Sequence, residues 1–195
     1  MTARKIAASD ITPPAQYAAQ RAERRRAVAE LKRNRRVEIG PLVTFYFECF
    51  ETMLHQVNEM LYIEKGGEAQ IADELAAYNP LIPNGSELTA TMMIEIEDPV
   101  RRARLLGELG NIEATVTMRF AGETVPGLPE DDQDRTNEAG KTSSVHFLHF
   151  PFTTAQIEKF RQPGTEVILG IGHDRYRHMA VLPEATRQAL AADFA

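Results

Sequence analysis

The sequence predicts a mixed α+β protein, in which N-terminal helices precede a ferredoxin-like β-α-β-β-α-β antiparallel sheet with an extra C-terminal strand and helix. Two observations predict this fold. Residues 1–80 have helical composition and spacing, and the hydrophobic period changes to two after a turn-rich boundary at residues 79–85. We therefore expect a helical segment of three helices at 1–80 and a sheet domain at 81–195, packed together as one globular unit.

Three helices are expected in the first segment. Residues 15–36 follow a pair of prolines and are rich in Ala, Arg, Glu and Leu, which favour helix. A second helix is expected from about 42 to 65, between Gly40-Pro41 and a pair of glycines. Ile71, Leu75 and Tyr78 are spaced by four and three residues, which predicts a third and shorter helix.

Strands and helices then alternate. In residues 87–97 the even positions are apolar and the odd positions polar, apart from Met93, which predicts a half-buried strand. Asp98 and Pro99 are typical of a helix start, so a short helix is expected at 100–109. Alternation returns at 112–120 and predicts a second strand.

A polar loop is expected at residues 121–141, followed by a strand at 143–150. Thr153 and Gln156 are spaced for a capping box, which predicts a helix at 153–160. A strand at 165–172 completes the β-α-β-β-α-β order, in which both helices would cover one face of the sheet. A further strand at 177–182 and a closing helix at 183–194 extend the fold.

The composition is that of a soluble globular protein. The chain of 195 residues is 43% hydrophobic and 26% charged, and it has no apolar run near the roughly 20 residues that a membrane helix needs. The two basic residues near the N-terminus precede no apolar stretch, so a cytoplasmic location is expected. The single cysteine, Cys49, cannot supply the thiolate set of a zinc or iron–sulfur site, so no cofactor is expected to bind through cysteine.

Charge is distributed unevenly. Residues 21–36 hold eight Arg or Lys and two Glu, a local charge of +6, while the rest of the chain sums to −12. Such a helix can be solvated, can bind an acidic protein partner or can bind nucleic acid. No aromatic interleaving or DNA-reading motif accompanies the basic residues, so nucleic acid is the least favoured partner.

The stretch FECFETMLHQVNEML, residues 47–61, raises the question of a metal or acid/base site. At about 100° per residue, a helix places its polar side chains Glu48, Glu51, His55 and Glu59 in one stripe. Carboxylates and imidazole bind non-haem iron, manganese or zinc, so a transition metal is possible. The same spacing also arises on the solvated side of any amphipathic helix, and no second copy supplies the paired motifs of di-iron bundles.

Enzyme motifs are absent from the sequence. It contains no phosphate loop, no complete dinucleotide loop, no Gly-x-Ser-x-Gly and no His-Glu-x-x-His. His173 and Tyr176 lie near the end of a predicted strand, where site residues often occur. Whether the protein is an enzyme stays open on these grounds.

Five stretches of the sequence belong to one recognisable pattern: RRVEIGP (35–41), FE (47–48), QVNEML (56–61), ELAAYNPLIPNGSELTAT (74–91) and GIGHDRYRH (170–178). Together they resemble an uncharacterised bacterial family, domain of unknown function 3501. The resemblance marks seven positions as partner-binding or site candidates: Arg35, Arg36, Glu48, Gln56, Glu59, Tyr78 and Asn79. His55 and Glu51 are outside the family pattern.

The family's activity is not established, but the genetic setting of its members implies partners such as rubrerythrin-like peroxidases and iron–sulfur oxidoreductases. The resemblance therefore implies a cytoplasmic accessory protein that binds an iron–sulfur or di-iron redox partner, with a role in oxidative stress. The alternative is a metal-binding protein or enzyme that uses the Glu48, Glu51, His55 and Glu59 stripe. No membrane partner is expected, and a homo-oligomer is compatible with the sequence.

Overall fold

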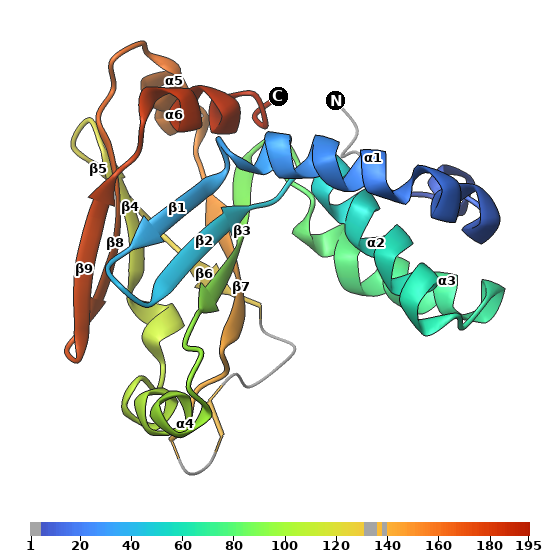
Figure 1. Ribbon diagram of the computed structural model, residues 1–195. Coiled ribbons are helices and arrows are strands. Elements are labelled where there is room, and N and C mark those ends of the chain that lie inside the picture. Colours follow the sequence, from blue (N-terminus) through green and yellow to red (C-terminus); the bar gives the residue numbers. More distant parts are fainter. Residues whose placement is uncertain (1–4, 131–135, 138–139) are drawn as a thin grey trace.

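The protein consists of a sandwich of two antiparallel sheets and an arm of three helices that projects from one side of it (Figure 1). The computed structural model describes residues 5–130, 136–137 and 140–195. The arm is built from α1 (Pro14–Lys32), α2 (Phe50–Glu64) and α3 (Glu68–Tyr78). Within the described ranges, no helix is both long and apolar enough to cross a membrane.

The first sheet has the strand order β1-β2-β3-β7-β6, and the second has the order β5-β4-β8-β9. The strands of the first sheet are β1 (Arg36–Ile39), β2 (Val43–Phe47), β3 (Glu87–Ile94), β7 (Val145–Pro151) and β6 (Leu128–Pro129). Those of the second are β5 (Glu123–Pro126), β4 (Val116–Phe120), β8 (Val167–His173) and β9 (Tyr176–Val181). Every neighbouring pair is antiparallel.

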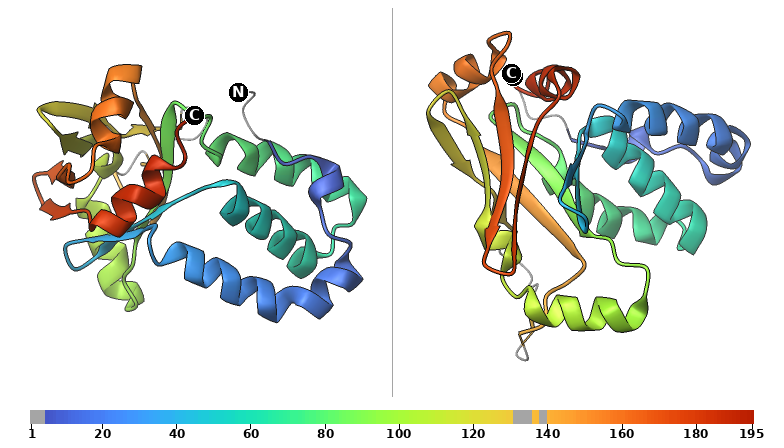
Figure 2. Two further views of the ribbon diagram at one scale, coloured as in Figure 1. Left: turned by 90° about the horizontal axis from the view of Figure 1, so that it is seen from above. Right: turned by 60° about the vertical axis from the view of Figure 1, so that its left-hand side comes forward.

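The main core lies between the two sheets, which form two layers in Figure 2. The predicted alternation of β3 is confirmed, because Leu88, Ala90, Met92 and Ile94 are all buried in this core. Three further helices close the sandwich: α5 (Thr154–Arg161) and α6 (Glu184–Ala191) at one end, and α4 (Pro99–Glu108) at the other (Figure 1). A smaller apolar cluster holds the helices of the arm together.

The capping residues predicted for the starts of α4 and α5 are confirmed. The Thr153 hydroxyl accepts a hydrogen bond from the Gln156 backbone N–H, and the Gln156 side chain accepts one from the Thr153 N–H, which makes a capping box. At α4 the Asp98 carboxylate accepts from the Arg101 N–H at 2.6 Å. Short 3-10 turns occur at η1 (Ala8–Asp10), η2 (Asn79–Leu81) and η3 (Ile112–Thr115), so the strand expected from residue 112 begins only at Val116.

A β-hairpin replaces part of the first two predicted helices. β1 and β2 pair across a turn at Gly40, whose φ of +65° is a conformation that favours glycine. Side chains of β1 alternate between exposed and buried, which is the period of a strand. The prediction of a purely helical segment at 1–80 is therefore wrong for residues 36–47, although three helices do lie within it. The domain division itself stays a prediction.

The ferredoxin-like topology is not found, although the four strands expected for it are all present. β3 pairs with β7 in the first sheet, whereas β4 pairs with β8 in the second. The other edge of β3 is occupied by β2 of the unpredicted hairpin. The extra C-terminal strand and helix are confirmed as β9 and α6, and the correct coarse description is α+β with two antiparallel sheets.

The loop expected at residues 121–141 is partly structured. It contains β5, which forms a hairpin with β4, and the two-residue β6, which pairs with β7. These strands are short and include Pro126 and Pro129, so their sequence does not resemble a strand. The part of the predicted loop at 131–135 and 138–139 lies outside the described residues.

Tyr176 has a structural role, because its side chain links the two sheets. Its buried hydroxyl donates to the Ile39 carbonyl at 2.6 Å and accepts from the Leu42 N–H at 2.9 Å, which joins β9 to the β1–β2 turn. The backbone of Gly40 lies close to this contact, since a Cβ at position 40 would be 2.6 Å from the His178 ring and 2.8 Å from the Tyr176 hydroxyl. The tight turn and the tyrosine therefore depend on each other.

We expect Tyr176→Phe to lower the free energy of unfolding by about 1–3 kcal/mol, because it leaves two backbone groups of the turn without their partner. Urea unfolding measures the change. Tyr46→Phe is the matched control, since the Tyr46 hydroxyl bonds Glu95 in an exposed position and its loss should cost no more than about 0.5 kcal/mol. Equal losses in the two variants would contradict the structural role of Tyr176.

Candidate functional site

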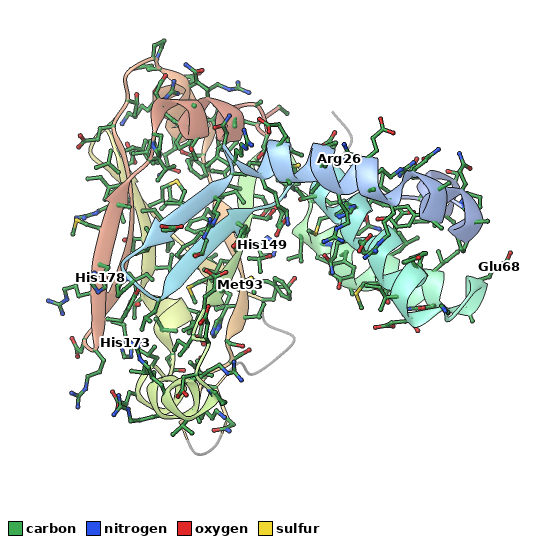
Figure 3. All side chains as sticks on the ribbon, in the orientation of Figure 1. Arg26, Glu68, Met93, His149, His173 and His178 are labelled. Carbon is green, nitrogen blue, oxygen red and sulfur yellow. The ribbon has the colours of Figure 1, made fainter. Side chains whose placement is uncertain are left out.

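A pocket lies at the inner corner between the first sheet and the helical arm. Its volume is about 300 Å³. Met93 and His149 mark the face of the sheet that is turned toward the arm (Figure 3). Residues from the three helices of the arm, from η2, from the β2–α2 junction and from strands β2, β3 and β7 line the pocket: Lys32, Tyr46, Glu48, Met53, Gln56, Tyr78, Leu81, Thr91, Met93, Val145 and Phe147.

Glu48 is the buried acid of this corner pocket, with only 3% of its surface exposed. It directly follows β2, and its backbone N–H donates to the Thr89 carbonyl at 2.9 Å, which extends the pairing with β3. Its Oε1 accepts from the Thr91 hydroxyl at 2.7 Å. Its Oε2 is buried and has no hydrogen-bond partner among the described residues. A buried polar atom without a hydrogen-bond partner lowers the free energy of unfolding by about 1–3 kcal/mol, and by more if the group is charged. Such atoms are rare in folded proteins, which makes Oε2 of Glu48 unusual.

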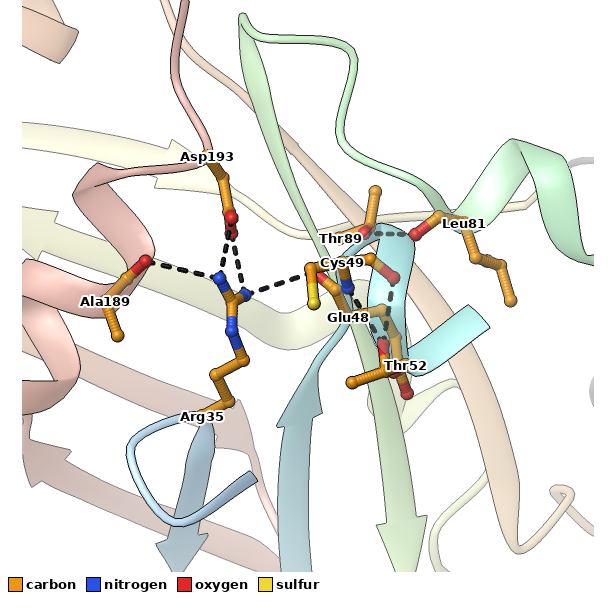
Figure 4. A network of polar contacts seen from close by, with 8 residues as sticks. All are labelled: Arg35, Glu48, Cys49, Thr52, Leu81, Thr89, Ala189 and Asp193. Atoms are coloured by element: carbon orange, nitrogen blue, oxygen red, sulfur yellow. Dashed lines mark hydrogen bonds and ion pairs between the residues drawn. The ribbon is translucent and has the colours of Figure 1, made fainter. Parts of the chain in front are cut away.

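Arg35 holds the backbone at Glu48 in place (Figure 4). The Arg35 guanidinium donates to the Glu48 carbonyl at 3.3 Å and forms a bidentate pair with Asp193 at 2.7 and 2.8 Å. It also reaches the Ala189 carbonyl of α6. Burial opposes the charged guanidinium, but the hydrogen bonds and charge of Asp193 outweigh it and raise the pKa of Arg35. Arg35 therefore fixes the β2–α2 junction and does not face the pocket.

The junction continues into α2 through Cys49, the residue before the helix. The Cys49 backbone N–H donates to the Thr52 hydroxyl at 2.9 Å, and that hydroxyl donates to the Cys49 carbonyl (Figure 4). The thiol is buried, and burial raises its pKa, so it stays protonated and unreactive at neutral pH.

Further polar groups surround the pocket. The Gln56 amide lies 3.5 Å from the Tyr78 hydroxyl, a long contact that leaves both groups able to bond elsewhere. The Lys32 ammonium lies 5.6 Å from the centre of the Tyr46 ring. The pocket thus combines a carboxylate, an ammonium, an amide and two phenols with an apolar wall.

The apolar wall explains the residue that disturbs the alternation of β3. Met93 is on the outward face of the strand, where its neighbours Thr89 and Thr91 are polar, and it lines the pocket with Val145 and Phe147 of β7. An apolar side chain on the outward face of a half-buried strand indicates that something covers it. Here the helical arm covers Met93, with the pocket between them.

Glu59 and His55 belong to a different network, between α1 and α2. Arg21 donates to both oxygens of Glu59 at 2.8 Å, and the buried Tyr17 hydroxyl donates to the same carboxylate at 2.7 Å. The hydrogen bonds from Arg21, with help from Tyr17, lower the pKa of Glu59 to about 2. His55 lies 3.2 Å from the Tyr17 hydroxyl, and burial lowers its pKa. These groups hold α1 onto α2.

The four residues of the predicted metal stripe are not brought together. Glu48 precedes α2 and bonds Thr91. Glu51 is exposed and lies close to Arg35 and Asp193. His55 and Glu59 face α1. Within the part of the chain that the structure describes, no group of three or more His, Cys, Asp or Glu could hold a metal ion. The helical projection does not apply to Glu48, because α2 begins at Phe50, after this residue.

The remaining sequence candidates have structural contacts. Arg36 pairs with Glu38 at 2.8 Å on the same strand. Asn79 binds both backbone groups of Ile6 and so fastens the N-terminal segment to the arm. His173 accepts from the Arg175 N–H and lies 3.2 Å from the Gly110 carbonyl, on the far side of the sandwich from the arm (Figure 3).

The structure therefore gathers three of the sequence candidates, Glu48, Gln56 and Tyr78, into one pocket. Sequence reasoning missed most of the residues that complete it, among them Lys32, Tyr46, Thr91 and Phe147. Met93 was the one visible signal of the sheet wall, since it broke the strand pattern. The others lie on elements whose packing against one another the sequence does not reveal.

Fold and site together define an α+β protein with a double antiparallel sheet, a helical arm and a polar pocket at their junction. The chain belongs to the family of proteins of unknown function called DUF3501, whose profile it matches over residues 5–194. It is also similar to a solved protein of unknown function from Burkholderia pseudomallei K96243, with 34% identity, a TM-score of 0.91, and coverage of 98% of this chain and 100% of that one. No curated protein matches it.

We expect Glu59→Gln to lower the free energy of unfolding at pH 7 by about 1–3 kcal/mol, since hydrogen bonds to a charged group are lost. The pKa of Glu59 is lower in the folded protein than in the unfolded chain, so its ionised form stabilises the fold above its ordinary pKa. This contribution is lost as pH falls to about 2, and the difference between wild type and variant should shrink over that range.

Urea unfolding at several pH values measures the difference. Glu23→Gln is the matched control on α1, because Glu23 is exposed. A difference between wild type and Glu59→Gln that stays constant from neutral to acid pH would contradict the assignment of the low pKa to the Arg21–Glu59 pair.

Proposed function

We propose that this protein is a cytoplasmic accessory protein that binds an acidic redox partner through α1. The observation that carries the proposal is the charge of this helix. Among the described residues, four basic side chains of the segment 21–36 have no ion pair: Arg24, Arg25, Arg26 and Lys32. The other four form ion pairs: Arg21 with Glu59, Arg33 with Glu30, Arg35 with Asp193 and Arg36 with Glu38.

The exposure of α1 supports the same proposal. Over its 19 residues only Tyr17 is buried, and the face of the helix turned away from α2 is exposed, so this face can meet a partner. Arg25 and Arg26 are exposed, and Figure 3 shows Arg26 on α1, which lies along the arm away from the sheets. Positive charge on such a helix, on a chain whose net charge is −6, attracts an acidic surface and orients it toward the arm.

The kind of partner rests on the family. Membership in DUF3501, with the genetic setting described above, favours an iron–sulfur or rubrerythrin-like di-iron protein. The role proposed here needs no metal in this chain, since the redox centre belongs to the partner. The stripe of Glu48, Glu51, His55 and Glu59 gains no support as a metal site, because its members face different neighbours.

We expect Arg25→Glu together with Arg26→Glu to weaken retention of the partner by about tenfold or more, since each reversal turns attraction into repulsion. The measurement is affinity capture from cells of the native host under anaerobic conditions, with iron determined in the recovered protein. Arg101→Glu with Arg104→Glu on α4 is the matched control, because both residues are exposed and lie away from the arm.

Two results would contradict the proposal. If the captured partners carry no iron, the redox class of partner is wrong. If both double variants retain the partner as well as the wild type does, α1 is not the binding surface. Recovery of nucleic acid that declines steeply with salt would instead favour the nucleic-acid alternative.

A further inference from the structure

We propose that the corner pocket is a binding site for a small monoamine with an apolar body, whose ammonium group is bound by Glu48. This site does not require the partner binding proposed for α1, although the two share Lys32. The starting point is the buried Oε2 of Glu48, which has no hydrogen-bond partner among the described residues although Oε1 is bonded to Thr91. A carboxylate oxygen only accepts hydrogen bonds, so the group it lacks is a donor.

The surroundings favour a charged donor. An ammonium group would supply both the hydrogen bond and the opposite charge that a buried carboxylate needs, and such charge-assisted bonds are stronger than neutral ones. The group that donates to the carboxylate, the Thr91 hydroxyl, is neutral. The Arg35 guanidinium bonds the backbone carbonyl of Glu48 and not its side chain. Among the residues that the structure describes, the side chain of Glu48 therefore has no cationic partner.

The walls favour an apolar body for the ligand. Met53, Leu81, Met93 and Val145 line the pocket, and Tyr46, Tyr78 and Phe147 add ring surfaces. Aromatic rings and methionine sulfur both accommodate cations and apolar groups. A volume of about 300 Å³ is at the small end of ligand sites, so the ligand is a compact molecule.

Lys32 limits the charge of the ligand. Its ammonium group lies beside the Tyr46 ring in the pocket wall and would repel a second positive charge. The site therefore favours a monoamine over a polyamine. Because Glu48 Oε2 is closed off in the structure, entry requires rotation of long side chains that line the pocket, such as Met53, Gln56 and Met93.

The test uses the full chain labelled with carbon-13 at its methionine methyl groups, titrated by NMR with n-butylamine, benzylamine, phenethylamine and spermidine. At concentrations of about 10 mM, which reach weak fragment affinities, the three monoamines should shift the signals of Met53 and Met93. The signal of Met118, which is buried in the main core, should not move. The neutral analogue 2-phenylethanol and the polyamine should bind more weakly than phenethylamine.

Glu48→Gln keeps the size of the side chain and removes its charge, so it should weaken phenethylamine binding by about tenfold or more. Glu95→Gln is the matched control, since Glu95 also lies on the outward side of the first sheet, bonded to Thr44 and Tyr46, but does not line the pocket. Met93→Trp, which narrows the pocket and keeps Glu48, should also weaken binding, and it serves if Glu48→Gln fails to fold.

Three outcomes would overturn the proposal. One is that no monoamine shifts Met53 or Met93. Another is that 2-phenylethanol binds as tightly as phenethylamine, which would make the pocket an apolar cavity without an ammonium site. The third is that Glu48→Gln, folded as judged by the unchanged Met118 signal, binds phenethylamine as the wild type does.

Discussion

The structure depends on the buried ion pair between Arg35 and Asp193. Arg35 lies between the end of α1 and β1, Asp193 follows α6, and the same guanidinium bonds the backbone at Glu48, where β2 turns into α2. The two ends of the β1–β2 hairpin and the distant C-terminal helix thus meet at one side chain. Losing either charge would leave the other buried without compensation, which costs several kcal/mol, whereas the intact bidentate pair satisfies both. The segment from which α2 starts is thereby fastened to α6.

The sequence predicted elements well where one face of an element meets water. β3 showed its alternation because its outward face is partly polar, and α5 showed its capping box because both partners are close in the chain. β2 was mistaken for helix because Thr44 is buried along with Val43, Phe45 and Phe47. A strand buried on both faces is a continuous apolar run, and its period is no longer visible.

The sequence does not predict the sheet topology, for a related reason. Periodicity shows that a segment is a strand and which face it buries, but it does not show which strand pairs with it. The pairing of β3 with β7 and of β4 with β8 is decided by contacts between distant segments. The site follows the same rule: family resemblance indicated Glu48, Gln56 and Tyr78, whereas Lys32 and Phe147 join them only through tertiary packing.

α1 belongs to two surfaces at once. Its exposed side holds the arginines Arg25 and Arg26, and its last residue, Lys32, is part of the pocket wall next to Tyr46. A helix shared in this way would link the two proposed surfaces thermodynamically, since a molecule that shifts α1 at one surface would change the free energy of binding at the other. Such linkage is reciprocal. A ligand in the pocket would change the affinity of α1 for its partner, and the partner would change the affinity of the pocket for its ligand by the same factor.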